Sequence, residues 1–200
     1  MRRISCIGDS ITFGAGVFAT RKTDAWPALW QKQLGEKFQV LNYGVSGATL
    51  QEEGDFPYRK YGFLDRLKKA SPELIVLMLG TNDSKPYNWN ASRYEREYEE
   101  LLSELLALPW KHQVALMIPP KAFEQQTTEV VAFDIRNSVI RDYVQPVIAA
   151  IGEKHSLPVI DLYTLTEDHP EYFDDGAHPN LPGNKAIADY VCGKLKDCLI

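Results

Sequence analysis

The sequence has few cysteines, no long apolar run and no strongly basic segment, and each shortage excludes a class of protein. Its three cysteines, Cys6, Cys192 and Cys198, lack the spacing of a metal site and do not form an even-numbered disulfide framework. No stretch approaches the roughly 18 apolar residues that a membrane-spanning helix needs. The formal net charge is −5 without a basic cluster, which argues against a nucleic-acid-binding surface.

The rest of the composition is that of an ordinary globular protein of 200 residues, 44% of them hydrophobic and 24% charged. We find no internal repeat, low-complexity tract or linker, so we expect one domain over residues 1–200. The apolar run after Met1-Arg2-Arg3 ends at Gly8-Asp9, too early for an export signal. The chain as given is therefore expected to be cytoplasmic, or exported if a signal peptide has been removed.

Short apolar runs alternate with longer helical patterns along the whole chain. Five runs are typical of β-strands: Arg3–Ile7, Gln39–Tyr43, Glu73–Leu79, Gln113–Ile118 and Pro158–Asp161. The third is apolar at successive positions, as expected for a central parallel strand covered on both faces. This alternation predicts an α/β fold in which a parallel five-stranded sheet lies between two layers of helices.

The helices between these strands differ in the clarity of their signals. Thr23 or Asp24 is expected to cap a helix through Leu34 that tolerates Pro27 in its first turn. Ser92 to Glu95 forms a capping-box pattern before an apolar helical stripe. The remaining predicted helices cover Phe63–Ala70, a stripe from Ile135 to Ile151 that Pro146 is expected to kink, and Pro182 to Lys196.

Polar segments follow the predicted strands where those strands end. They are Gly8-Asp9-Ser10 after the first strand, Gly44-Val45-Ser46-Gly47 after the second, Gly80-Thr81-Asn82-Asp83 after the third, and Asp175-Gly176-Ala177-His178-Pro179 in a longer loop after the fifth. The carboxyl ends of parallel strands meet at one edge of a sheet, where ligands bind in such folds. We therefore expect these four segments to converge on one site.

Ser10, His178 and Asp175 have the side chains of an acyl-transfer triad. A hydroxyl needs a base to become a nucleophile, and the base needs a carboxylate to orient it. Asp175 precedes His178 by three residues, so its carboxylate can reach the imidazole within one turn; Asp174 is the neighbouring competitor. The rival histidines are expected in surface roles: His112, His155 and His169.

Ser46 is a poorer candidate for the nucleophile. Its surroundings look like the G-x-S-x-G turn of other hydrolases, but Ala48 stands where the last glycine belongs.

Together, the four polar segments resemble those of the SGNH hydrolases, also called the GDSL esterase/lipase family. The resemblance spans nearly the whole chain and implies a flavodoxin-like three-layer α/β/α fold, with serine hydrolase chemistry that uses no metal or other cofactor. It implies Ser10 as nucleophile, His178 as base and Asp175 as its orienting acid. It also implies an oxyanion hole made by the backbone N–H groups of Ser10 and Gly47 and the side-chain amide of Asn82.

Two further aspartates adjoin these groups. We expect Asp9 and Asp83 to brace the loops by accepting backbone hydrogen bonds.

The predicted substrate is a small-molecule ester, an acylated sugar in particular. Tyr87 and Trp89 lie in the polar loop after Asn82, and Tyr58 lies in an aromatic and basic cluster, so these three aromatics are our candidate substrate-binding residues. Aromatic faces beside polar donors suit sugar rings better than long acyl chains. The plain alternative is that these rings pack the loops. The third segment is also similar to that of family members assigned as sialate or other carbohydrate O-acetylesterases, so O-deacetylation of a sugar is predicted.

Four other functions remain open. An acyl-CoA thioesterase or a lysophospholipase would use the same fold and triad. A metal-dependent phosphoesterase would use Asp9, Asn82, Asp83 and His178 as ligands, and an inactive carbohydrate-binding module would have kept only the fold. The sequence does not indicate an oligomeric state.

Overall fold

A computed structural model describes residues 1–123 and 132–199 of the chain. In this part of the chain, five strands form one parallel sheet in the order β2-β1-β3-β4-β5. The strands are β1 (Arg2–Gly8), β2 (Phe38–Gly44), β3 (Leu74–Met78), β4 (Gln113–Ile118) and β5 (Val159–Asp161). Each predicted strand is confirmed to within two residues at either end.

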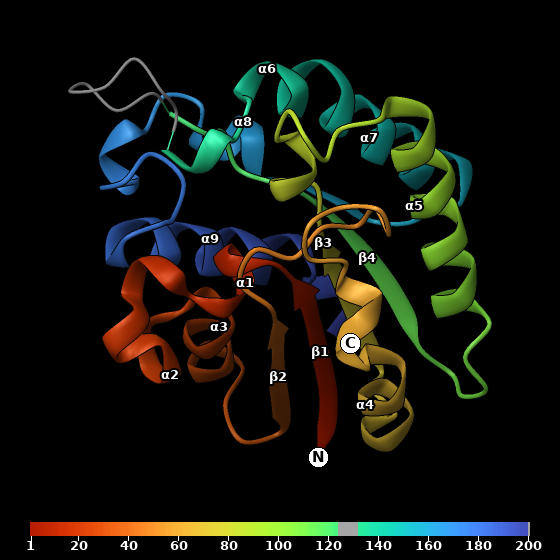
Figure 1. The fold of residues 1–200 in the computed structure, drawn as a ribbon. Helices are drawn as coiled ribbons and strands as arrows, with labels where there is room; N and C mark the ends of the chain where they lie inside the picture. Colours follow the sequence, from red (N-terminus) through yellow and green to blue (C-terminus); the bar gives the residue numbers. More distant parts are fainter. Residues whose placement is uncertain (124–131, 200) are drawn as a thin grey trace.

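Helices cover both faces of this sheet (Figure 1). On one face α3 (Trp26–Leu34) and α9 (Leu181–Lys194) enclose a core cluster that includes Trp26, Trp30 and Ile187. On the other face the cover is formed by α4 (Phe63–Ala70), α5 (Ala91–Leu106) and α7 (Gln145–Lys154). The predicted three-layer α/β/α arrangement is therefore confirmed. None of the helices in the described part combines the length and hydropathy that crossing a bilayer takes.

The central strand β3 explains why its sequence shows no polar alternation. Every residue from Leu74 to Met78 is buried. Ile75 and Leu77 point into the core beneath α4 and α5, whereas the residues that alternate with them pack beneath α3 and α9. Because both faces of this strand are covered, apolar side chains are favoured at every position.

The predicted beginnings of two helices are wrong by one or two residues. Thr23 and Asp24 belong to a separate short helix, α2 (Arg21–Asp24), and the extended Ala25 precedes α3, whose first turn contains Pro27 as expected. The capping-box prediction is also wrong. The capping residue is Asn90, whose side chain accepts the N–H of Arg93 at 2.9 Å, and Ser92 lies inside α5, which begins at Ala91. In both cases the helix begins at a different residue than predicted, but the predicted helix forms.

The apolar stripe that contains Pro146 includes a widened turn just before the proline, and the kink expected at Pro146 itself stays a prediction. A π-helical segment, Ile140–Val144, joins the short helix α6 (Asn137–Val139) to α7. Pro146 lies in the first turn of α7, where its missing N–H is tolerated.

Candidate active site

Ser10 is the first residue of the short helix α1 (Ser10–Phe13), immediately after β1 and Asp9. The carboxylate of Asp9 caps this helix by accepting the N–H of Ile11 at 2.9 Å. The strand ends, the helix cap turns the backbone, and the Ser10 hydroxyl is left at the carboxyl edge of the sheet. Ser10 is 7% exposed, so its surroundings hold this side chain on nearly all sides.

The structure brings Ser10, His178 and Asp175 together across almost the full length of the chain. His178 Nε2 lies 2.9 Å from Ser10 Oγ, and His178 Nδ1 lies 2.7 Å from Asp175 Oδ2. Both distances are those of good hydrogen bonds. A carboxylate on Nδ1 holds the proton at that nitrogen, which leaves Nε2 free to accept the proton of the serine hydroxyl.

Asp175 also shapes the loop that carries the histidine. Its Oδ1 atom accepts the backbone N–H groups of Ala177 at 2.9 Å and His178 at 2.7 Å. Burial alone would raise the pKa of Asp175, but the hydrogen bonds from the His178 side chain and from these two N–H groups outweigh it and lower the pKa to about 2. The competitor Asp174 points elsewhere and accepts from Asn180 Nδ2 at 2.8 Å.

Asn82 and Gly47 lie on neighbouring loops of the same sheet edge. Asn82 Nδ2 donates to the carbonyl of Ala48, the residue after Gly47, at 3.1 Å. Gly47 has φ +79°, in the left-handed region that favours glycine. The amide of Asn82 has a second N–H, so one donor of this side chain is left for a ligand while the other ties the two loops together.

Asp9 and Asp83 brace the site as predicted. Asp83 accepts the backbone N–H of Leu50 at 2.9 Å and that of Gln51 at 2.8 Å, which joins the loop after β3 to the loop after β2. Burial raises the pKa of both carboxyl groups to about 6. Through these two hydrogen bonds, the buried Asp83 side chain fixes the loops that carry the candidate oxyanion donors Gly47 and Asn82.

We expect Asp9 ionisation to make the folded state less stable as the pH rises. Its folded pKa of about 6 lies above the ordinary 3.8, so the folded protein holds this proton more tightly and loses stability between about pH 4 and pH 6. Asp9→Asn keeps an oxygen for the Ile11 N–H but does not ionise. Urea unfolding measures the free energy of unfolding of both proteins. From pH 4 to pH 8, this free energy should increase for the variant relative to the wild type, by at most roughly 3 kcal/mol. A difference that does not change with pH would contradict this.

Three residues near the triad were not singled out by sequence analysis. The Phe133 ring meets the His178 imidazole edge-on with centroids 5.1 Å apart, and 55% of this residue is exposed. A side chain at position 47 would lie 3.4 Å from the ring of Phe56, which is 49% exposed. Arg136 donates from Nε to the carbonyl of Ser84 at 2.7 Å, which anchors its segment to the loop after β3. No motif marks these residues, because their positions depend on contacts between distant segments.

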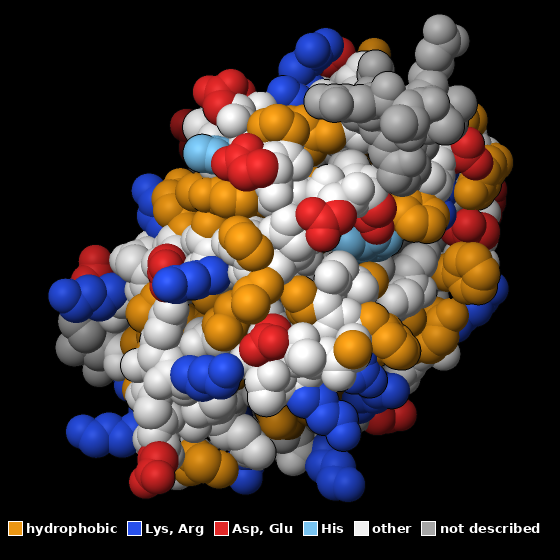
Figure 2. All heavy atoms as spheres, turned by 90° about the vertical axis from the view of Figure 1, so that its left-hand side faces the viewer, with side chains coloured by type: hydrophobic (Ala, Val, Ile, Leu, Met, Phe, Trp, Pro, Cys, Tyr) orange, Lys and Arg blue, Asp and Glu red, His pale blue; other side chains and the backbone are white. Residues whose placement is uncertain are grey.

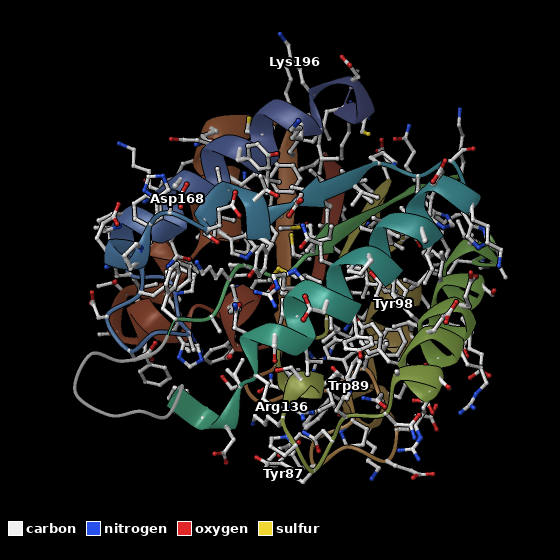
Figure 3. The ribbon with its side chains drawn as sticks, turned by 90° about the horizontal axis from the view of Figure 1, so that it is seen from above. Tyr87, Trp89, Tyr98, Arg136, Asp168 and Lys196 are labelled. Atoms are coloured by element: carbon white, nitrogen blue, oxygen red, sulfur yellow. The ribbon has the colours of Figure 1, made fainter. Side chains whose placement is uncertain are left out.

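The three predicted substrate-binding aromatics have different surroundings. Tyr58 is only 2% exposed and its hydroxyl donates to the carbonyl of Tyr43 at 2.6 Å, so it is a core residue and its proposed substrate contact is wrong. Trp89 is half-buried and packs against Tyr94 and Tyr143. Tyr87 is 61% exposed at the periphery of the same loop and stays a prediction (Figure 3).

The rival residues have other partners. His155 contacts Glu99 and His169 contacts Glu171, each at 2.8 Å. Ser46 is exposed in the loop after β2. Within residues 1–123 and 132–199, no group of three or more His, Cys, Asp or Glu side chains is arranged to hold a metal ion. The ligand set that a metal-dependent phosphoesterase requires is therefore not assembled in the described part.

At the edge of the parallel sheet, a serine is hydrogen-bonded to a histidine, which is hydrogen-bonded to a carboxylate. This arrangement is the catalytic triad of a serine hydrolase. The chain belongs to the GDSL-like lipase/acylhydrolase family, whose model matches residues 6–186. This membership puts the chain among the carboxylic ester hydrolases of the SGNH/GDSL type.

Individual proteins similar to this chain include esterases and a thioesterase. An acetylxylan esterase of Xylanibacter ruminicola is 34% identical over 97% of this chain, which covers 43% of that relative and so spans less than half its length. The thioesterase 1/protease 1/lysophospholipase L1 of Escherichia coli K12 is 24% identical over 95% of this chain and 81% of its own length. A carbohydrate acetylesterase family member from Sinorhizobium meliloti has the same fold, with a TM-score of 0.80 at 22% identity over 100% of this chain and 99% of its own.

Proposed function

We propose that this protein hydrolyses acetyl esters of a carbohydrate, with Ser10 as nucleophile, His178 as general base and acid, and Asp175 as the orienting acid. The observation that carries the proposal is the hydrogen-bonded series from Ser10 Oγ through His178 to Asp175, at 2.9 and 2.7 Å. These distances lie within the range that proton transfer between a nucleophile and its base requires.

In the first half of the reaction, Ser10 Oγ attacks the ester carbonyl carbon while His178 Nε2 takes the hydroxyl proton. The carbonyl oxygen becomes an oxyanion, and we assign its stabilisation to the N–H groups of Ser10 and Gly47 and the amide of Asn82. Collapse of this intermediate breaks the bond to the alcohol, which receives the proton from Nε2. Water then attacks the acyl-enzyme by the same route and releases the acid and free Ser10.

Asn82→Ala is expected to lower kcat on p-nitrophenyl acetate by about 10²–10³-fold with little change in KM. The reason is that an oxyanion donor acts on charge that develops only in the transition state. Steady-state kinetics measure the two constants separately, and the melting temperature checks that the loop held by the Asn82–Ala48 bond still folds. A folded variant with the wild-type kcat would remove Asn82 from the oxyanion hole.

Two features support a sugar as the alcohol part of the substrate. The leaving oxygen must come within hydrogen-bonding distance of His178 Nε2, so the alcohol lies beside Phe133, whose exposed ring is typical of a surface on which a pyranose packs. The acetylxylan esterase relative, at 34% identity, supports acetyl as the acyl group. Sialate as the particular sugar has no support in these comparisons.

A thioesterase or lysophospholipase is the second candidate, and the Escherichia coli relative favours it. The experiment that separates the two candidates is hydrolysis of p-nitrophenyl esters from acetate to palmitate, followed by acetylated xylo-oligosaccharides, O-acetylated sialic acid and palmitoyl-CoA. We expect activity that peaks at acetate and extends to an acetylated sugar. A peak at long chains with turnover of palmitoyl-CoA would contradict the carbohydrate proposal while leaving the triad intact.

A further inference from the structure

A cavity of about 430 Å³ lies beside the free edge of the sheet, between strand β2 and helices α1, α2 and α3. Its lining contains three cationic side chains, Arg21, Lys22 and Lys32, and no Asp or Glu among the described residues. Figure 2 views the molecule from the side of α2 and α3, and Lys and Arg side chains gather on the lower part of this face. This positive charge stands out in a chain whose formal net charge is −5.

Two of the three cations of this cavity lack acidic partners in the described part of the chain. Arg21 and Lys22 form no ion pair there, whereas Lys32 pairs with Asp24 at 4.0 Å. The Nε atom of Arg21 is buried and has no hydrogen-bond partner among those residues. A buried donor without a partner is costly, so the hydrogen-bonding capacity of this guanidinium is not fully used by the described part of the protein.

A second cavity shows that such an excess of positive charge is not general in this protein. It measures about 420 Å³, and its lining includes the basic residues Arg2 and Lys111. Glu73 and Asp197 line it as well, and Arg2 pairs with Glu73 at 2.7 Å. Arg2 of this second cavity is therefore offset by an acid of the protein itself, unlike Arg21 and Lys22 beside β2.

Arg21 is also held in a fixed orientation. Its guanidinium carbon lies 4.3 Å from the centroid of the Phe13 ring and 5.6 Å from that of Phe18. Stacking fixes the plane of the guanidinium, whose N–H fork matches a carboxylate or phosphate in two parallel hydrogen bonds. Lys22 and Lys32 add positive charge from the flanking helices.

We propose that this cavity binds a sugar that carries an oxyanion, either a uronate or a sugar phosphate. The volume is within the range of small-molecule sites and exceeds what an inorganic ion fills. Phe13 and Pro27 supply apolar surface for the ring, and the three cations supply the charge that selects the acid group. A neutral sugar would gain only the apolar contacts with Phe13 and Pro27.

The cavity lies next to the candidate active site. Phe13 in its lining is the last residue of α1, the helix that begins with Ser10, so the two are one helical turn apart. The following segment packs against the histidine loop, since a side chain at Gly16 would lie 2.2 Å from the carbonyl oxygen of Pro179. Under the proposed function, on which this step rests, the cavity would hold an acidic substituent of the substrate outside the reaction centre.

Isothermal titration of the full chain with glucuronate, glucose 6-phosphate, glucose and inorganic phosphate tests the proposal. We expect glucuronate or glucose 6-phosphate to bind at least about tenfold more tightly than glucose and than phosphate alone. Lys22→Gln with Lys32→Gln should weaken that binding about tenfold. The matched control, Lys68→Gln with Lys69→Gln, removes the same charge from exposed positions on α4 and should leave it unchanged. Arg21→Lys keeps the charge but loses the planar fork, and should weaken binding as well.

Equal binding of glucuronate, glucose 6-phosphate and glucose would overturn the proposal, as would equal affinities of the two double variants. Phosphate that binds as tightly as both charged sugars would reduce the cavity to a simple anion site and overturn the sugar part. These ligands carry no carboxylic ester, so the result is independent of whether the chain hydrolyses sugar acetates. A failure of the proposed function and a failure of this site are thereby distinguishable.

Discussion

Ser10→Ala is expected to lower kcat on p-nitrophenyl acetate by about 10⁴-fold or more, because it removes the only atom that forms the acyl-enzyme. Ser10 Oγ is the hydroxyl that His178 Nε2 contacts at 2.9 Å. The substitution deletes a single oxygen from a residue that already begins a helix, so the fold should be retained. Burst kinetics offer a second measurement, since the wild type should release p-nitrophenol in a burst that the variant lacks.

Ser46→Ala is the matched control for this experiment. Ser46 lies on a loop of the same sheet edge and is exposed, so its substitution removes the same oxygen from a nearby position. Wild-type turnover is expected for this variant. If Ser46→Ala lost turnover and Ser10→Ala kept it, the nucleophile would be Ser46 and the triad as described would be wrong.

His178→Ala is expected to lower kcat by a similar factor, about 10⁴-fold, because no other side chain in the described part of the protein is hydrogen-bonded to Ser10 Oγ as a base. The other described histidines have partners away from Ser10 and offer no replacement: His112, His155 and His169. The measurement is the pH profile of kcat/KM. Residual activity of the variant should rise with hydroxide concentration, whereas a profile that matches the wild type would show that the base lies elsewhere.

Asp175→Asn distinguishes an orienting carboxylate from a mere loop support. An amide keeps an oxygen for the backbone N–H groups of Ala177 and His178, but it presents an N–H to His178 Nδ1. The imidazole would then carry its proton on Nε2 and could not accept from Ser10. We therefore expect a large loss of kcat with little loss of melting temperature. A variant that keeps its activity but melts earlier would indicate that Asp175 serves the loop alone.

The fold could be predicted from the sequence largely because the apolar pattern and the sheet agree at every strand. Strand β3 is apolar throughout because two helical layers cover it, and that pattern is visible in one dimension. Helix beginnings were harder to predict. The cap at Asn90 competes with a good capping box at Ser92, and only the backbone geometry at Asn90 decides between them.

The triad was predictable because its motifs follow strand ends that meet at one edge. Tyr58 shows the limit of such reasoning, because an aromatic in a polar segment can fold inward when its hydroxyl finds a carbonyl, here that of Tyr43. Phe133 shows the converse. Its position over His178 depends on contacts between remote segments, such as that of Arg136 with Ser84, and no local pattern encodes them.

The separation of Ser10 and His178 along the chain has a consequence for folding. Ser10 begins α1, whereas His178 lies 168 residues further along, shortly before α9. The backbone N–H of Trp26, at the start of α3, donates to Asn184 of α9 at 2.9 Å, and Asn184 Nδ2 donates to the carbonyl of Pro179, the residue after His178, at 2.6 Å. A chain in which α9 has not docked consequently holds an inert serine. Hydrolysis is therefore expected only after the segments around Ser10 and His178 have packed together, and not from the segment around Ser10 alone.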